Sequence, residues 1–126
     1  MSEAKFYRCA HCGNVLVAVE DGGVVPQCCG EPMELLVPGS TDAAAEKHVP
    51  VVTERDHHVV VRVGEVDHPM TEEHHIQWVA LASDAMVAVK YLRPGDEPEV
   101  RFGRGCAAGG TVYAYCNLHG LWKAEV

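Results

Sequence analysis

Positive charge and aromatic residues are both scarce in this sequence of 126 residues. It contains 10 Lys and Arg against 18 Asp and Glu, for a formal net charge of −8, and only 6% aromatic residues. Phosphate backbones are bound by clustered Lys and Arg, so this balance argues against a nucleic-acid-binding function. An acidic protein also repels anionic substrates, and an anion would therefore need a local positive charge to bind.

Long apolar runs are also absent. No stretch of 18 apolar residues occurs, and the first six residues contain no basic segment followed by an apolar one. We therefore expect no membrane span and no signal peptide, and we predict a cytoplasmic protein. Cysteines stay reduced in that compartment, so the six cysteines are expected to be metal ligands rather than disulfide partners.

Apolar residues make up 48% of the chain, and Val is abundant among them, which favours β-structure. The length suits one domain of about 90 residues plus a small module that needs help to fold. Linker-like residues at 37–42 place the boundary between them. We therefore expect a first module at 1–37 and a second domain at 38–126.

The first module contains two pairs of cysteines separated by a predicted hairpin. Cys9 and Cys12 form a C-x-x-C motif followed by Gly13, and Cys28 and Cys29 are adjacent. Such pairs are typical of a four-thiolate metal site, and spacing alone fits zinc and iron equally well. The alternatives are a structural zinc clip and a strained disulfide between Cys28 and Cys29.

The second domain reads as short β-runs separated by turn residues, which predicts an antiparallel sandwich resembling an immunoglobulin fold. A short helical turn is expected at 43–47, capped by Thr41 or Asp42. Trp78 and Trp122 are expected to lie in the core or in the wall of a site. The seven predicted strands are residues 49–53, 59–63, 76–82, 86–92, 99–102, 111–116 and 121–125.

A second metal site is predicted from one thiol and several imidazoles at strand edges and loops. Structural zinc takes four ligands, so four imidazoles plus a thiolate suit iron with one open position better. A thiolate opposite that position would push electron density toward its ligand, which predicts redox chemistry on a small oxygen-derived species. The candidate ligands are His48, His68, His74, Cys116 and His119.

Glu46 and Lys47 immediately precede His48. A carboxylate there can occupy or release the open position, and an ammonium group can attract an anion to it. The alternative is an ordinary solvated charged loop. His57 and His58 lie in a predicted hairpin turn and are expected to be solvated.

Six segments together resemble desulfoferrodoxin, the two-iron class of superoxide reductase, and the resemblance extends from about residue 6 to the end of the chain. The segments are residues 9–14, 28–33, 39–42, 46–50, 68–70 and 115–120.

This resemblance implies a fold, a cofactor set and an activity. It implies a desulforedoxin-like module with one iron on the four cysteines Cys9, Cys12, Cys28 and Cys29, and an immunoglobulin-like domain with a mononuclear iron. The second iron would be held by four equatorial histidines and the axial Cys116. By the same resemblance, ferrous iron reduces superoxide to hydrogen peroxide, and rubredoxin or a similar donor restores it. It further implies that Lys47 steers superoxide, that Glu46 binds the ferric site after product release, and that the chain forms a homodimer.

The chain departs from the family pattern in two places. An aromatic residue often follows the third histidine ligand, whereas this chain has His75, and the six-residue step from His68 favours His74 as the ligand. The Gly-rich residues 103–110 match no segment of the family pattern. Cys106 within them is expected to be a free thiol without a role. An electron-transfer protein with a vestigial second site and a zinc-stabilised binding module are the alternative functions.

Overall fold

A computed structural model describes residues 3–126, and the chain divides into two compact units. One unit is Ala4–Val37, and the other is Pro38–Val126 together with Glu3. The prediction of an all-β chain is confirmed, since the two helices of the described residues have four residues each. Within residues 3–126, no helix is long and apolar enough to cross a bilayer.

The smaller unit is built from five very short strands. Three of them form an antiparallel sheet in the order β2-β1-β5, and β3 and β4 form a separate hairpin. A small buried cluster of this unit contains Tyr7, Cys9 and Met33, and Phe6 is also buried. So small a core supplies little stability, and a bound metal would add to it. The strands are β1 (Phe6–Arg8), β2 (Val15–Val17), β3 (Gln27–Cys28), β4 (Glu31–Pro32) and β5 (Glu34–Leu35).

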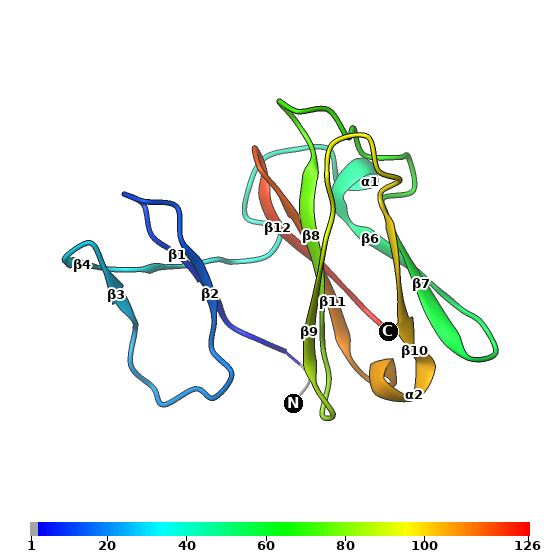
Figure 1. Cartoon of the computed structure of the whole chain (residues 1–126), viewed down its shortest axis with the longest axis horizontal. Helices are drawn as coiled ribbons and strands as arrows, with labels where there is room; N and C mark the ends of the chain where they lie inside the picture. Colours follow the sequence, from blue (N-terminus) through cyan, green and yellow to red (C-terminus); the bar gives the residue numbers. More distant parts are fainter. Residues whose placement is uncertain (1–2) are drawn as a thin grey trace. The chain divides into compact units, whose positions relative to one another are not determined.

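The larger unit is a sandwich of two antiparallel sheets, as Figure 1 shows, and this confirms the predicted immunoglobulin-like architecture. One sheet has the order β10-β7-β6, and the other has the order β12-β11-β8-β9. All seven predicted strands are present, with their ends shifted by at most one residue. They are β6 (Pro50–Glu54), β7 (His58–Val63), β8 (Ile76–Ala82), β9 (Val87–Tyr91), β10 (Glu99–Gly103), β11 (Thr111–Cys116) and β12 (Gly120–Glu125).

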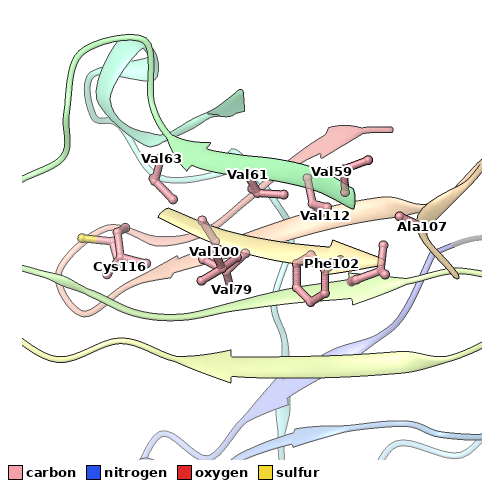
Figure 2. Packing of buried hydrophobic residues seen from close by; sticks show 12 residues of the cluster. Val59, Val61, Val63, Val79, Val100, Phe102, Ala107, Val112 and Cys116 are labelled. Carbon is pink, nitrogen blue, oxygen red and sulfur yellow. The ribbon is translucent and has the colours of Figure 1, made fainter. Parts of the chain in front are cut away.

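The core lies between these two sheets. Strand β7 alternates strictly, with Val59, Val61 and Val63 fully buried and the intervening side chains partly exposed. Because side chains alternate across a strand, this pattern directs one face of β7 inward. Strand β11, which is paired on both sides, is buried along its whole length. Figure 2 shows the core with Cys116 at one end and Ala107 at the other.

Two local predictions need correction, and one short helix was not predicted. Helix α1 (Ala45–His48) begins after Ala44, which makes no side-chain cap, so neither Thr41 nor Asp42 caps it. The Gly-rich stretch contains a second helical turn, α2 (Arg104–Ala107), that its composition did not predict. His57 is exposed as expected, whereas the neighbouring His58 begins β7, pairs with Gly103 of β10 and is half-buried.

We predict that Leu81→Ala lowers the free energy of unfolding by about 2–5 kcal/mol, since Leu81 of β8 is fully buried in the core. Val89→Ala on the edge strand β9, where the side chain is 39% exposed, should change it by about 0.5 kcal/mol or less. Urea unfolding of the metal-loaded proteins measures both values. Equal losses would contradict this assignment of the core.

Candidate metal centres

The structure brings the four cysteines of the smaller unit together. Their sulfur atoms all lie within 4.8 Å of one another. The Sγ atoms of Cys12 and Cys28 are 3.6 Å apart, and those of Cys28 and Cys29 are 4.0 Å apart. Four sulfurs placed about 2.3 Å from one tetrahedral metal ion would be about 3.8 Å apart, so the cluster fits such an ion. The cysteines are free thiols, and Cys28 and Cys29 do not form the alternative disulfide.

Backbone conformation explains how two adjacent cysteines reach one centre. Cys29 has φ 55, and it is the one non-glycine residue with positive φ among residues 3–126. This left-handed conformation is costly for a residue with a Cβ, and such outliers concentrate at functional sites. On the other side of the centre, the N–H of Cys12 donates to Cys9 Sγ at 3.5 Å, and Gly13 with φ 81 turns the chain.

Protonation of the four thiols is strongly uneven. The backbone N–H of Cys12 is the main cause that lowers the pKa of Cys9 to about 6. The surrounding thiols, Cys9 first, raise the pKa of Cys29 to about 12. One sulfur is thus readily ionised while another holds its proton, because the protonated thiol of Cys29 hydrogen-bonds to the neighbouring sulfurs. A cation at the centre would favour the thiolate form of all four and displace the remaining protons.

The second cluster lies at one end of the larger unit, where helix α1 and the connection from β7 to β8 meet (Figure 1). His48 ends α1, and Cys116 ends β11. Ligand atoms of His48, His68, His74 and Cys116 lie within 4.8 Å of one another. His119 joins them, with its Nδ1 3.2 Å from His48 Nε2 and 3.8 Å from Cys116 Sγ. All five predicted ligands are therefore close together.

The four imidazoles are arranged as a square. Neighbouring rings have centroids 4.6–5.0 Å apart and stand nearly perpendicular, at 79–84°. His48 and His74 face each other across the square at 6.3 Å. Ring nitrogens can thus approach one central point from four sides, and the thiol of Cys116 can approach it along a fifth direction.

Hydrogen bonds to the backbone identify the tautomers of two of these rings. Nδ1 of His48 lies 2.7 Å from the carbonyl of Ala44, and Nδ1 of His68 lies 2.7 Å from the carbonyl of Pro69. A carbonyl oxygen only accepts, so each Nδ1 carries the proton and each neutral ring presents an Nε2 lone pair. These two Nε2 atoms are 3.1 Å apart, and neither carries a proton when both rings are neutral.

Such an arrangement of lone pairs fits a metal ion. Two nitrogens that lie about 2.1 Å from one ion at a right angle are about 3 Å apart, which matches the observed separation. Nε2 of His74 is buried and has no hydrogen-bond partner within the described chain. Uncompensated buried polar atoms are rare, and here a metal ion would provide the missing partner.

Burial favours the neutral form of three of these imidazoles, and a neutral ring can bind a cation. Burial lowers the pKa of His68 to about 4, and it also lowers the pKa of His48 and of His74. The indole of Trp122 packs on His48 with a centroid distance of 4.9 Å, and its Nε1 donates to the carbonyl of His119. Trp122 therefore forms part of the site wall, and Trp78 is buried against Tyr115, as predicted for both tryptophans.

Cys116 is a fully buried thiol at the end of the hydrophobic core (Figure 2). Burial raises its pKa, while the backbone N–H groups of Leu118 and His119 point at the sulfur and oppose that increase. These two donors would stabilise a thiolate once a metal ion displaces the proton.

Glu46 and Lys47 are exposed on α1, directly before His48. Neither side chain makes a hydrogen bond or ion pair with any residue of the described range 3–126. The charge of Lys47 acts on His48 and is among the causes that lower its pKa. An unpaired ammonium group beside the imidazoles can attract an anion to them.

Gly64 is a structural residue of this site that sequence reasoning did not identify. It is buried with φ 131, and a Cβ on it would lie 2.6 Å from the carbonyl carbon of Lys47 and 2.7 Å from its Cα. The N–H of Val66 also donates to the carbonyl of Glu46. Only glycine allows α1 to pack this closely, but in the sequence Gly64-Glu65 reads as an ordinary turn.

Comparisons of the sequence and of the structure with known proteins identify similar proteins of one kind. The family model described as Desulfoferrodoxin matches residues 40–125, and the one described as Desulfoferrodoxin, N-terminal domain, matches residues 2–36. The desulfoferrodoxin of Nitratidesulfovibrio vulgaris is 46% identical over 126 residues, which cover 98% of each chain. A desulfoferrodoxin homolog of Methanothermobacter thermautotrophicus is 48% identical over 118 residues, or 94% of this chain and 95% of its own. The crystal structure of the superoxide reductase from Treponema pallidum aligns with a TM-score of 0.78 and 35% identity, covering 98% of this chain and 99% of that one.

We predict that the metal-free protein loses stability as the pH falls from 6.5 to 4. His68 has a pKa of about 4 when folded and an ordinary value of 6.5 when unfolded, so the unfolded state binds more protons in this window. The resulting contribution of His68 to the free energy of unfolding is at most about 3 kcal/mol, and it is fully present above pH 6.5. Unfolding of chelator-treated protein at pH 7 and pH 4.5 measures the loss, which should be smaller in His68→Gln. The same pH dependence in both proteins would contradict a neutral, buried His68.

Proposed function

Since the chain belongs to the desulfoferrodoxin family, we propose that its two clusters are iron sites and that the second one reduces superoxide. The protein is an oxidoreductase that acts on superoxide, and its four-cysteine and His/Cys clusters match the two iron-binding domains of this family. The observation that carries the assignment is the pair of Nε2 lone pairs of His48 and His68, 3.1 Å apart. The earlier resemblance of the sequence to this family is confirmed.

We assign the first iron to the module at residues 1–37 and the second to the domain at 38–126. The first set of ligands would be the four cysteines, and their sulfur separations support this role. The second set would be four neutral imidazoles and one thiolate, supported by the square of rings. The proposed ligands are Cys9, Cys12, Cys28 and Cys29 for the first site, and His48, His68, His74, Cys116 and His119 for the second.

The reaction consumes one superoxide, one electron and two protons for each hydrogen peroxide formed. Ferrous iron, when bound, supplies the electron. Because the imidazoles are neutral, Cys116 is the one anionic ligand, and this set leaves the centre with positive charge that favours an anion. Lys47 adds a mobile ammonium group beside it and offsets the repulsion from a protein of net charge −8. Glu46 would supply a carboxylate to the open position after the product leaves.

A one-electron donor must restore the reduced state, and we propose rubredoxin or a similar protein for this role. We further propose a cytoplasmic location, which the unpaired thiols of all six cysteines support. We also propose that the chain forms a homodimer, and this part of the proposal rests on the family resemblance.

Replacing Lys47 tests the steering role. We expect Lys47→Ala to slow the reaction with superoxide by about 10-fold or more at low ionic strength and to weaken its salt dependence, because a steering charge is lost. Iron content should not change. Arg55→Ala is the matched control, since it removes one positive charge from the β6–β7 turn, at the opposite end of these strands from α1. Pulse radiolysis gives the rate constants, and an unchanged rate in Lys47→Ala would rule out steering.

Replacing the thiol tests the ligand assignment. Cys116→Ser should abolish thiolate-to-iron absorption of the oxidised second site and leave the absorption of the four-cysteine site intact, because Cys116 is the one thiol in the second cluster. Cys106→Ser, which changes the half-buried thiol in α2, should preserve both spectra. If both absorptions survived in Cys116→Ser, the proposed ligand set would be wrong.

A further inference from the structure

Two adjacent histidines are candidates for the same ligand position in the second site. His74 and His75 are both half-buried, and each has a buried ring nitrogen without a hydrogen-bond partner within residues 3–126. These atoms are Nε2 of His74 and Nδ1 of His75. Either imidazole could bind a metal ion, so a feature of the fold must decide which of them faces the cluster.

The backbone on both sides of His74 is held by one side chain, that of Asn117. Its Oδ1 accepts the N–H of His75 at 2.9 Å, and its Nδ2 donates to the carbonyl of Glu73 at 2.9 Å. The N–H of Asn117 also donates to the carbonyl of His75 at 3.2 Å. Asn117 directly follows Cys116, so these bonds join the turn that carries the thiol to the segment that carries His74.

His74 lies in a bend directly before β8, and His75 is the next residue. Adjacent side chains leave the backbone in different directions, so a shift of one residue would exchange His74 for His75. The pairing of β8 with β11 is irregular at this point, with a shift between Tyr115 and Cys116. Backbone pairing resumes after this shift with Cys116 opposite Ile76 and the N–H of Asn117 donating to the carbonyl of His75, and the side chain of Asn117 adds two further bonds to the resumed register. In the observed register the ring of His74 lies 4.6 Å from that of His68 and 5.0 Å from that of His119.

We propose that Asn117 is a positioning residue that selects His74 over His75 as the imidazole presented to the His/Cys centre. The inference rests on the proposed role of His74 as an iron ligand. The two hydrogen bonds of the Asn117 side chain hold Glu73 and His75 in place, and this directs the His74 ring toward the cluster and the His75 ring away from it.

The selection of His74 can be tested by measuring the iron content of variants of the whole chain, one of which should recover iron that another has lost. His74→Ala should lose the second-site iron, because Asn117 prevents His75 from replacing the missing ligand. His74→Ala with Asn117→Ala should recover a substantial part of that iron, since the freed segment can present His75. Adding His75→Ala to this pair should abolish the recovery. A purely structural role of Asn117 would only lower the iron content further.

Electron paramagnetic resonance of the oxidised second site gives an independent readout with both histidines present. Asn117→Ala should show two iron species, and Asn117→Ala with His75→Ala should show one. Thr71→Ala is the matched control: Thr71 Oγ1 accepts the N–H of His74 at 3.1 Å and donates to the carbonyl of His74 at 3.2 Å, so this variant loosens the same segment without removing the bonds of Asn117. Its removal should leave a single species.

Two results would overturn the inference. The first is second-site iron in His74→Ala that disappears in His74→Ala with His75→Ala, because His75 would then bind despite Asn117. The second is a single species in Asn117→Ala together with no recovery of iron in the double variant. Either result, with normal iron content and peroxide formation in the unmodified protein, leaves the proposed function intact. An unmodified protein without second-site iron would instead overturn the proposed function.

Discussion

Repulsion between ring nitrogens is the constraint on which the second site depends. His48 and His68 each donate from Nδ1 to a backbone carbonyl, so their Nε2 lone pairs face each other at 3.1 Å. Without a cation, this contact is unfavourable, and burial disfavours the protonation that would relieve it, because it lowers the pKa of both rings. The backbone carbonyls of Ala44 and Pro69 accept the Nδ1 protons and thereby orient both Nε2 atoms for metal binding.

The sandwich supplies the rigidity that keeps these lone pairs together. Cys116 belongs to the hydrophobic core, and the same strand that buries its backbone presents its sulfur to the site. On the opposite sheet, β7 leads into Gly64, whose missing side chain lets α1 pack directly on the backbone. A metal site needs ligands held closely in place, and here the core of the domain provides that support.

The four-cysteine unit obtains its order differently. Its buried cluster is small, its strands have two or three residues, and Cys29 adopts an unfavourable left-handed conformation. These features leave little hydrophobic stabilisation to offset chain entropy, so a metal bound to the four cysteines would add to the stability of this unit. The larger domain has a hydrophobic core of its own beside its cluster.

Short β-runs separated by turn residues determined the seven strands of the sandwich from the sequence alone, because turn residues interrupt the apolar segments that form strands. Motif spacing likewise determined the four cysteines and identified the candidate histidines, since ligand chemistry is restricted to a few residue types. The tertiary structure decided what depends on contacts between distant segments. It placed His74 rather than His75 in the cluster, revealed Gly64 beneath α1, and showed Asn117 bonded to residues 42 and 44 positions away. No local pattern encodes such contacts, because they exist only once the strands have paired.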